Sequence, residues 1–214
     1  KQNLPFLSEL CRRTDVFLVD LDAPFGNLGC VIMASGLGRR FGGQKLMEVF
    51  REKPLIQWAL DATEGVFARR IVVTRHEDVR DLCLSQNIPV LVHNLPKRSD
   101  TVRLGLKTIV RNIDGCMFCP ADQPLLRQET VACLALCAVH EKKYIWRPSY
   151  EGSPGSPILF PRWTFSQLLH LPSGKGGNVI AKAYPKQVRL LPVLDPLELS
   201  DVDRPVDLQR LKER

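Results

Sequence analysis

The sequence has no long apolar run. No stretch approaches the ~20 consecutive apolar residues that a membrane-spanning helix requires, and the first residues lack the charged, apolar and small-residue regions of a secretory signal. We therefore expect a cytoplasmic chain with no membrane partner. No internal repeat or low-complexity segment is present, and with 44% hydrophobic and 25% charged residues the chain is not expected to be disordered as a whole.

Aromatic residues are also scarce, at 7% of the 214 residues. The net charge is +7 and the pI is about 9.2, but the lysines and arginines are scattered, and no basic run is interleaved with aromatic residues. Nucleic acid is therefore not the expected partner. An enzyme that handles multiply phosphorylated small molecules accounts for the basic charge equally well.

The seven cysteines are an odd number without the spacing of a disulfide framework. Cys116 and Cys119 are spaced like half a zinc site, but the run between them reads as a strand, in which residues three apart point to opposite faces. Cys133 and Cys137 share one face if their segment is a helix. We expect buried reduced thiols, with a composite four-cysteine zinc site as the alternative.

The most informative segment is the stretch from Cys30 to Lys45, C-V-I-M-A-S-G-L-G-R-R-F-G-G-Q-K. Its apolar start has no polar alternation, which is typical of a parallel strand buried on both faces. The glycines that follow let backbone N–H groups approach a ligand closely, and two arginines and a lysine add positive charge. This combination suits a polyanion, most simply a nucleoside triphosphate.

The spacing excludes the two commonest phosphate-binding loops. A Walker A loop requires Gly-Lys followed by Ser or Thr, whereas Gln44 separates Gly43 from Lys45 and Leu46 follows. A dinucleotide fingerprint has two residues between its second and third glycines, whereas three separate Gly38 from Gly42. An ordinary glycine-rich strand-to-helix turn is the structural alternative.

The pattern that fits is A-x-G-x-G-x-R-x-G-x-x-K, which runs here from Ala34 to Lys45. It resembles the signature loop of nucleotidyltransferases, and most closely that of the molybdenum cofactor cytidylyltransferase and guanylyltransferase family. The resemblance implies that this loop binds the nucleotide through seven residues: Ala34, Ser35, Gly36, Gly38, Arg39, Arg40 and Lys45. Two further nucleotide-binding residues come from a later segment described below. Ser35 occupies the position at which the family carries Ala for one base and Gly for the other.

After residue 28, short apolar runs alternate with longer amphipathic ones. We predict strands at 30–34, 70–74, 90–93, 116–120, 144–147, 157–160 and 188–193, and helices at 54–66, 77–86, 101–111, 127–140, 163–169, 177–183 and 205–212. This alternation predicts an α/β fold of three layers, with a mainly parallel twisted sheet between helices on both faces. The family implies the Rossmann-like nucleotidyltransferase version. Its ligand site is expected beyond the carboxyl ends of the strands.

Residues 1–28 do not follow this pattern, so we predict an N-terminal extension or linker over 1–28 and a nucleotidyltransferase domain over 29–214. The segment from Asp15 to Asp22 is compatible with a strand that ends in carboxylates, and Asp20 and Asp22 invite a metal interpretation. A tail or linker is favoured, because Pro24, Gly26 and Asn27 follow at once.

Asp122 follows the predicted strand 116–120, on the same sheet edge as the glycine loop. A capping role is disfavoured because Gln123-Pro124-Leu125 separates it from the next predicted helix. Mg²⁺ is normally held by one or two carboxylates together with phosphate oxygens. The D-Q-P triplet also resembles the second motif of the molybdenum cofactor cytidylyltransferases, and it favours cytidine over guanosine.

Two further segments resemble the family. Arg98 to Leu106 resembles its serine-rich segment, which implies nucleotide contacts from Ser99 and Thr101, although both residues are also acceptable helix caps and the acidic Asp100 departs from the family pattern. Tyr150 to Phe160 resembles its G-x-x-G-H-P segment, which implies acceptor binding by Gly155, Ser156 and Pro157. Here Ser156 replaces the family histidine.

The last matches lie near the carboxyl terminus. Ser173 to Gly177 resembles the family's G-D-x-G turn without the aspartate. Leu199 to Leu208 is close to its D-I-D-x-P-x-D-L ending, and Asp201 and Asp203 share a face if the segment is a strand. Either of them can bind the same metal ion as Asp122, so the predicted metal ligands are Asp122, Asp203 and Asp201. The resemblance covers roughly residues 29–210.

The resemblance implies transfer of a nucleoside monophosphate from CTP or GTP, CMP being favoured, to the terminal phosphate of molybdopterin or molybdenum cofactor. Pyrophosphate leaves, Mg²⁺ or Mn²⁺ is the cofactor, and the catalytic residues are Arg40, Lys45 and Asp122. Lys45 is expected near the α-phosphate. Three alternatives stay open: a nucleotidyltransferase acting on a sugar or polyol phosphate, a non-catalytic cofactor-binding protein whose partner is a molybdenum hydroxylase, and a nucleic-acid-binding module.

Overall fold

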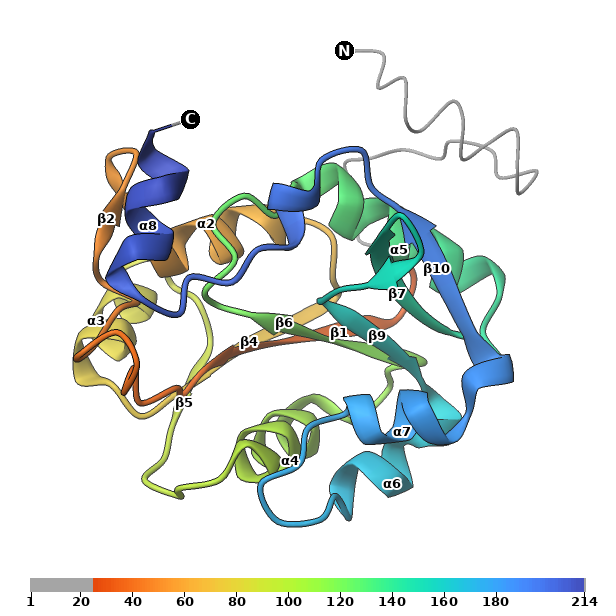
Figure 1. Ribbon diagram of the computed structural model, residues 1–214. Coiled ribbons are helices and arrows are strands. Elements are labelled where there is room, and N and C mark those ends of the chain that lie inside the picture. Colours follow the sequence, from red (N-terminus) through yellow and green to blue (C-terminus); the bar gives the residue numbers. More distant parts are fainter. Residues whose placement is uncertain (1–24, 214) are drawn as a thin grey trace.

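The computed structural model describes residues 25–213, which form one α/β fold (Figure 1). Its main sheet has eight strands in the order β10-β7-β9-β6-β1-β4-β5, with β8 paired to β7. The strands are β1 Leu28–Ala34, β4 Arg69–Thr74, β5 Val90–Val92, β6 Gly115–Pro120, β7 Ile145–Tyr150, β8 Ser153–Pro154, β9 Ile158–Pro161 and β10 Val188–Pro192. Since β9 runs antiparallel to β6 and β7, and β8 runs antiparallel to β7, the sheet is mixed and mainly parallel. The predicted fold class is confirmed.

Helices cover both faces of the sheet (Figure 1). Three pack on one face: α2 Leu55–Ala62, α3 Glu77–Ser85 and α5 Gln128–His140. Three pack on the other: α4 Arg98–Ile109, α6 Phe165–Leu169 and α7 Asn178–Ala183. Within β1, Val31 belongs to the core under α4 while Ile32 belongs to the core under α2 and α5. The central strands are thus buried on both faces, as their unbroken apolar runs predict.

The cysteines follow the same alternation. Cys116 lies in the core on the α4 side and Cys119 in the core on the α5 side, so the two thiols face apart, as expected for a strand. All six cysteines between residues 25 and 213 are buried. Burial raises the pKa of Cys119 to about 12. A thiol with so high a pKa stays protonated at neutral pH, which is typical of structural cysteines.

A third, smaller apolar cluster lies apart from the two faces of the sheet. It joins the short antiparallel hairpin of β2 (Val49–Phe50) and β3 (Lys53–Pro54) to the last helix, α8 (Pro205–Lys212). Its buried members are Phe50, Leu55, Val202, Leu208 and Leu211. Through this cluster, the carboxyl-terminal segment is attached beside the glycine loop.

Most predicted elements are present, with shifted ends. Helix α4 begins at Arg98 rather than Thr101, because the Asp100 carboxylate accepts a hydrogen bond from the Lys97 backbone N–H and so caps an earlier turn. Helix α2 starts after Pro54 and ends at Ala62 rather than Val66. A 3₁₀ turn over Arg162–Thr164 precedes α6. The hairpin β2–β3 and strand β8 were not predicted, since strands of two residues show no periodicity.

The fold already includes residues just before the predicted domain boundary at residue 29. Leu28 is the first residue of β1, and Phe25 packs in the core of the α5 side. The segment from Asp15 to Asp22, with Asp20 and Asp22, lies outside the described residues. None of the helices between residues 25 and 213 has the length and hydrophobicity needed to cross a membrane.

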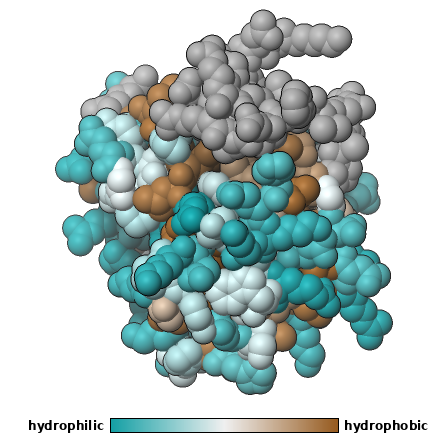
Figure 2. Space-filling model, turned by 90° about the vertical axis from the view of Figure 1, so that its right-hand side faces the viewer, coloured by the Kyte–Doolittle hydropathy of each residue, from teal (hydrophilic) through white to brown (hydrophobic). Residues whose placement is uncertain are grey.

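Figure 2 shows the molecule turned by 90° about the vertical axis from the view of Figure 1. The lower part of this face bears mostly hydrophilic residues, with smaller apolar areas between them. The mixture is typical of the surface of a folded protein in water.

Candidate functional site

A cavity of about 580 Å³ opens at the carboxyl ends of β1, β4 and β6. Its lining is strongly basic, with six cationic residues: Arg39, Arg40, Lys45, Arg75, Lys97 and Arg98. Two carboxylates, Asp122 and Asp203, also line it. The position agrees with the rule that open α/β sheets bind ligands beyond the carboxyl ends of their strands. Four positive charges in excess over the carboxylates favour an anionic ligand.

The glycine loop closes on itself through Gly38. Its carbonyl accepts hydrogen bonds from the backbone N–H groups of Phe41, Gly42 and Gly43, at 2.9, 3.0 and 3.3 Å. Gly38 has a φ of +59°, and a Cβ atom there would lie 1.8 Å from the Gly43 carbonyl oxygen. No other residue fits this position without rebuilding the loop.

The preceding part of the loop keeps its donors free. The backbone N–H groups of residues 37–40 donate to no acceptor among residues 25–213. They border the cavity, so an anion placed there can accept hydrogen bonds from several successive amides.

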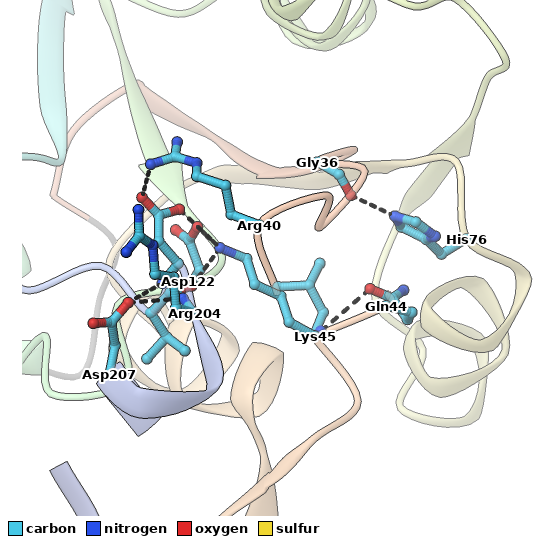
Figure 3. A network of polar contacts seen from close by, with 11 residues as sticks. Gly36, Arg40, Gln44, Lys45, His76, Asp122, Arg204 and Asp207 are labelled. Atoms are coloured by element: carbon cyan, nitrogen blue, oxygen red, sulfur yellow. Dashed lines mark hydrogen bonds and ion pairs between the residues drawn. The ribbon is translucent and has the colours of Figure 1, made fainter. Parts of the chain in front are cut away.

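Two side-chain contacts fix the loop to the β4–α3 region, and Figure 3 shows the one between His76 and Gly36. The His76 Nε2 atom lies 2.8 Å from the Gly36 carbonyl oxygen, and Gln44 Nε2 donates to Asp78 Oδ1 at 3.3 Å. The loop is therefore held at both its start and its end. A preformed loop binds an anion with less ordering cost than a mobile one.

Lys45 lies at the base of the site and is 7% exposed. Its ammonium donates to Asp122 Oδ2 at 2.7 Å, lies 3.5 Å from Asp203 Oδ1, and donates to the Val202 carbonyl oxygen (Figure 3). An ammonium has three N–H donors, so each has an acceptor in the protein. In this arrangement Lys45 holds two carboxylates together. Its predicted position near the α-phosphate stays a prediction.

Arg40 completes the cluster. Its Nη1 atom lies 2.8 Å from Asp203 Oδ2, and its side chain is 68% exposed. Exposed ion pairs of this kind contribute little to stability and exchange readily. Arg40 is therefore available to an incoming anion.

The two carboxylates come from segments about 80 residues apart. Asp122 follows β6, and its carbonyl oxygen accepts a hydrogen bond from Val202 N–H at 2.9 Å. Asp203 precedes α8, where the Asp207 carboxylate accepts from the backbone N–H groups of Asp203 and Arg204, at 3.0 and 2.7 Å (Figure 3). The first turn of α8 thus fixes the position of Asp203.

Asp201 does not share this position. Residues 201–203 form no strand, and Asp203 lines the cavity while Asp201 does not. The prediction that Asp201 and Asp203 alternate as in a strand is wrong. The backbone N–H groups of residues 202 and 203 donate to Asp122 and Asp207 and not to a neighbouring strand. Loss of solvation, and next the charge of Asp122, raise the pKa of Asp201 to about 6. Asp201 is thus close enough to Asp122 for the charge of Asp122 to raise its pKa, but it does not line the cavity.

Ser35 and Thr101 line the cavity and form a polar group with His93 behind them. Ser35 Oγ donates to the Val73 carbonyl oxygen at 3.0 Å and lies 2.8 Å from His93 Nε2. His93 Nδ1 accepts from Leu95 N–H at 3.1 Å, so Nε2 is the protonated nitrogen of a neutral ring. Burial, and next the charge of Arg75, lower the pKa of His93, which agrees with this assignment.

Sequence reasoning missed three cations of the cavity. Arg75 directly follows β4, just as Ser35 follows β1, and Lys97 and Arg98 begin α4. The rule that parallel strands place their carboxyl ends at one edge would have found Arg75. Lys97 and Arg98 were hidden because the helix was predicted to start at Thr101.

The other predicted ligand-binding residues divide into two groups. Ala34 and Thr101 lie at the cavity end of β1 and α4, and Thr101 lines the cavity. Ser99 is fully buried, and its hydroxyl accepts from Gly174 N–H at 3.1 Å. It therefore connects α4 to the turn at residue 174 and does not line the cavity.

The predicted acceptor segment lies beyond the cavity lining. The register of β9 on β6 places Pro157 and Ser156 beside the carboxyl end of β6, on the same sheet edge as Asp122. The Gly155 carbonyl oxygen accepts from Arg147 Nε and Nη2, at 2.9 and 2.6 Å. Arg147 is largely buried in β7, so this segment is firmly held at the edge of the site.

The residues of the site fit a divalent cation. Asp122 and Asp203 contact the same ammonium, so their carboxylates lie together beside the Val202 carbonyl. Such hard oxygen donors are those that Mg²⁺ and Mn²⁺ accept. No group of three or more His, Cys, Asp and Glu side chains suited to a metal occurs between residues 25 and 213. The protein offers two carboxylates, and the remaining ligands of an Mg²⁺ ion are commonly water and phosphate oxygens.

Comparisons with known proteins found a curated relative, similar solved structures and a matching family model. A probable molybdenum cofactor guanylyltransferase of Bacillus licheniformis is 30% identical over 109 residues, which are 49% of this chain and 53% of that protein. The match thus spans about half the length of that relative.

Two solved structures share the fold. The crystal structure of Rv0371c from Mycobacterium tuberculosis H37Rv has a TM-score of 0.79 at 24% identity, and the match covers 88% of this chain and 99% of that one. Rv0371c in complex with manganese has a TM-score of 0.71 at 23% identity, covering 87% and 98%.

The model of the MobA-like NTP transferase domain matches residues 30–188, which is more than half of the chain. The match contains the glycine loop, Lys45, Arg75 and Asp122. This chain belongs to the family of MobA-like NTP transferase domains.

Proposed function

We propose that this protein is a metal-dependent nucleotidyltransferase that transfers a nucleoside monophosphate from a triphosphate to the terminal phosphate of molybdopterin or molybdenum cofactor. The observation that carries the proposal is the cavity in which free loop amides and six cations face the paired carboxylates of Asp122 and Asp203. Such a reaction requires positioning and charge neutralisation more than a covalent intermediate.

The glycine loop holds the triphosphate in this proposal. The amides of residues 37–40 and the side chains of Arg39 and Arg40 bind the β and γ phosphates. Arg40 exchanges its exposed contact with Asp203 for a phosphate oxygen. As pyrophosphate leaves, these donors stabilise the charge that it gains.

Asp122 and Asp203 would hold the metal ion. When bound, a divalent cation supplies positive charge to phosphate oxygens. The manganese complex of the similarly folded mycobacterial protein supports a divalent metal at this fold. Lys45 keeps the two carboxylates together and oriented towards the cavity, and it acts on the reaction through them.

Molybdopterin as acceptor rests on the named relative and on the residues 155–157. The relative from Bacillus licheniformis is described as a probable molybdenum cofactor guanylyltransferase. The segment 155–157 lies beside the carboxyl end of β6, where an acceptor phosphate would meet the α-phosphate. Among the bases, the D-Q-P triplet at Asp122 supports CMP and the name of the relative supports GMP. We propose CMP as the preferred group, with a direct comparison as the test.

The test is to incubate the protein with molybdopterin, Mg²⁺ and each of CTP, GTP, ATP and UTP in turn. We expect a molybdopterin dinucleotide and pyrophosphate in equal amounts, with CTP as the best substrate, detected by mass spectrometry and a coupled pyrophosphate assay. Tight pterin binding without pyrophosphate from any triphosphate would contradict the proposal and favour a cofactor-binding accessory protein.

A further inference from the structure

Arg75 is a cation of the cavity that has no counter-ion within residues 25–213. In that part of the chain it forms one hydrogen bond, from Nη2 to the Leu95 carbonyl oxygen at 2.6 Å. Its Nε atom is buried and has no acceptor among residues 25–213. Arg40 and Lys45, by contrast, are paired with carboxylates. A buried, unsatisfied N–H on a group that lines a cavity is the kind of donor that a ligand completes.

The place of Arg75 in the sheet separates it from the phosphate and metal end. The strands run in the order β6, β1, β4, β5, with Asp122 after β6 and Arg75 after β4. Neighbouring strands are ~4.8 Å apart, so two spacings put these strand ends about 10 Å from each other. If the phosphates lie over Asp122 and the glycine loop, a nucleotide that extends along the sheet edge brings its base to Arg75.

The surroundings hold Arg75 in place and keep its end of the cavity free of negative charge. Its acceptor, Leu95, donates its own N–H to the neutral His93, and His93 contacts Ser35. The carboxylate of Asp100 is occupied by Lys97 N–H and by Arg103. The hydrogen bond to Leu95 thus orients the guanidinium, and no carboxylate of the described residues pairs with it.

We propose that Arg75 reads the nucleobase, an inference that rests on the proposed function. A guanidinium only donates hydrogen bonds, so it fits a base with two adjacent acceptors. Guanine has such a pair in O6 and N7, and cytosine has one in O2 and N3. In adenine, N1 and N7 lie beside the N6 amino donor, and in uracil both oxygens lie beside the N3–H donor. Arg75 thus selects guanine or cytosine nucleotides over adenine and uracil nucleotides.

The test measures equilibrium binding of CTP, GTP, ATP and UTP, and of inorganic tripolyphosphate, to the wild type and to Arg75→Met and Arg75→Lys. The wild type is expected to bind its preferred nucleotide, CTP or GTP, at least about 10-fold more tightly than ATP and UTP. Both variants lose that preference but keep the wild-type affinity for tripolyphosphate. The Arg75→Lys variant does not keep the base preference, because an ammonium is a point charge without the planar fork of a guanidinium. Arg80→Met, which removes a half-buried arginine of α3 that lies outside the cavity lining, leaves every affinity unchanged.

Two results would overturn the inference while the proposed function stands. One is an equal weakening of all four nucleotides and of tripolyphosphate in Arg75→Met, which would make Arg75 a phosphate ligand. The other is wild-type selectivity in both variants. A wild type that binds none of the four triphosphates would instead overturn the proposed function, and the role of Arg75 with it.

Discussion

At the scale of single residues, Lys45 is the side chain that most changes the picture of the site. The signature loop predicts a lysine near the α-phosphate, and the structure adds three contacts that the loop does not predict: its N–H donors point to Asp122, Asp203 and the Val202 carbonyl. A pattern of residues gives the type and spacing of side chains. It does not give their partners when these come from segments more than 70 residues away.

Lys45→Met would leave two neighbouring carboxylates without their cation. We expect the free energy of unfolding to fall by about 1–3 kcal/mol in the absence of metal, and Mg²⁺ to raise the melting temperature of the variant more than that of the wild type. The control is Lys53→Met, which removes an exposed pair with Asp61 and costs at most about 1 kcal/mol. Equal responses of the variant and the wild type to Mg²⁺ would refute this role of Lys45.

His93 should make stability depend on pH. Burial, and next the charge of Arg75, lower its pKa below the ordinary 6.5. Between the two pKa values the unfolded chain binds a proton that the folded protein does not, so stability is fully present above about pH 6.5 and falls as the pH decreases. We expect the melting temperature to decrease less in His93→Gln than in the wild type when the pH is lowered from 7.5 to 5.5. Identical losses would show that His93 is not responsible.

At the scale of elements, the helices and strands with a clear periodicity could be predicted, and the short ones could not. The buried runs of β1 and β6 were found because an unbroken apolar stretch between turn residues is typical of a strand buried on both faces. The hairpin β2–β3 was missed although Phe50 anchors the third apolar cluster, because two-residue strands leave no pattern. The start of α4 was missed because Asp100 caps an earlier turn.

The same limit applies to the site. Asp122 could be located because it follows a buried strand, and Asp203 because its segment resembles the family ending. The choice between Asp201 and Asp203 depends on how the first turn of α8 binds the backbone N–H of Asp203, which is a tertiary arrangement that periodicity does not specify.

Helix α8 should therefore control the metal site through its first turn. Asp207→Ala removes the carboxylate that binds the N–H groups of Asp203 and Arg204. We expect a loss of about 1 kcal/mol in stability and, in addition, a weaker affinity for Mg²⁺ in the presence of nucleotide, measured by calorimetry. Val206→Ala, at an exposed neighbour, serves as control. An unchanged metal affinity in Asp207→Ala would show that Asp203 keeps its position without this cap.

At the scale of the whole molecule, the fold brings distant segments to one edge of the sheet. The parallel arrangement of β6, β1 and β4 gathers Asp122, the glycine loop and Arg75 there. The third apolar cluster adds the carboxyl-terminal segment with Asp203. Within residues 25–213, the paired carboxylates therefore lie at the β6 end of this edge, and Arg75, which pairs with no carboxylate there, lies at the β4 end.

The central claim is that this edge catalyses metal-dependent transfer from a triphosphate. The most direct test replaces, one at a time, the two aspartates that flank β6 and measures the rate of pyrophosphate release by each variant. Asp122 follows β6 in the cavity, whereas Asp114 precedes it at the opposite edge and contacts the exposed Lys142. With molybdopterin and Mg²⁺, we expect Asp122→Asn to lower the rate at least about 100-fold, Asp114→Asn to keep the wild-type rate, and a chelator to abolish release in both. A wild-type rate in Asp122→Asn would contradict the account.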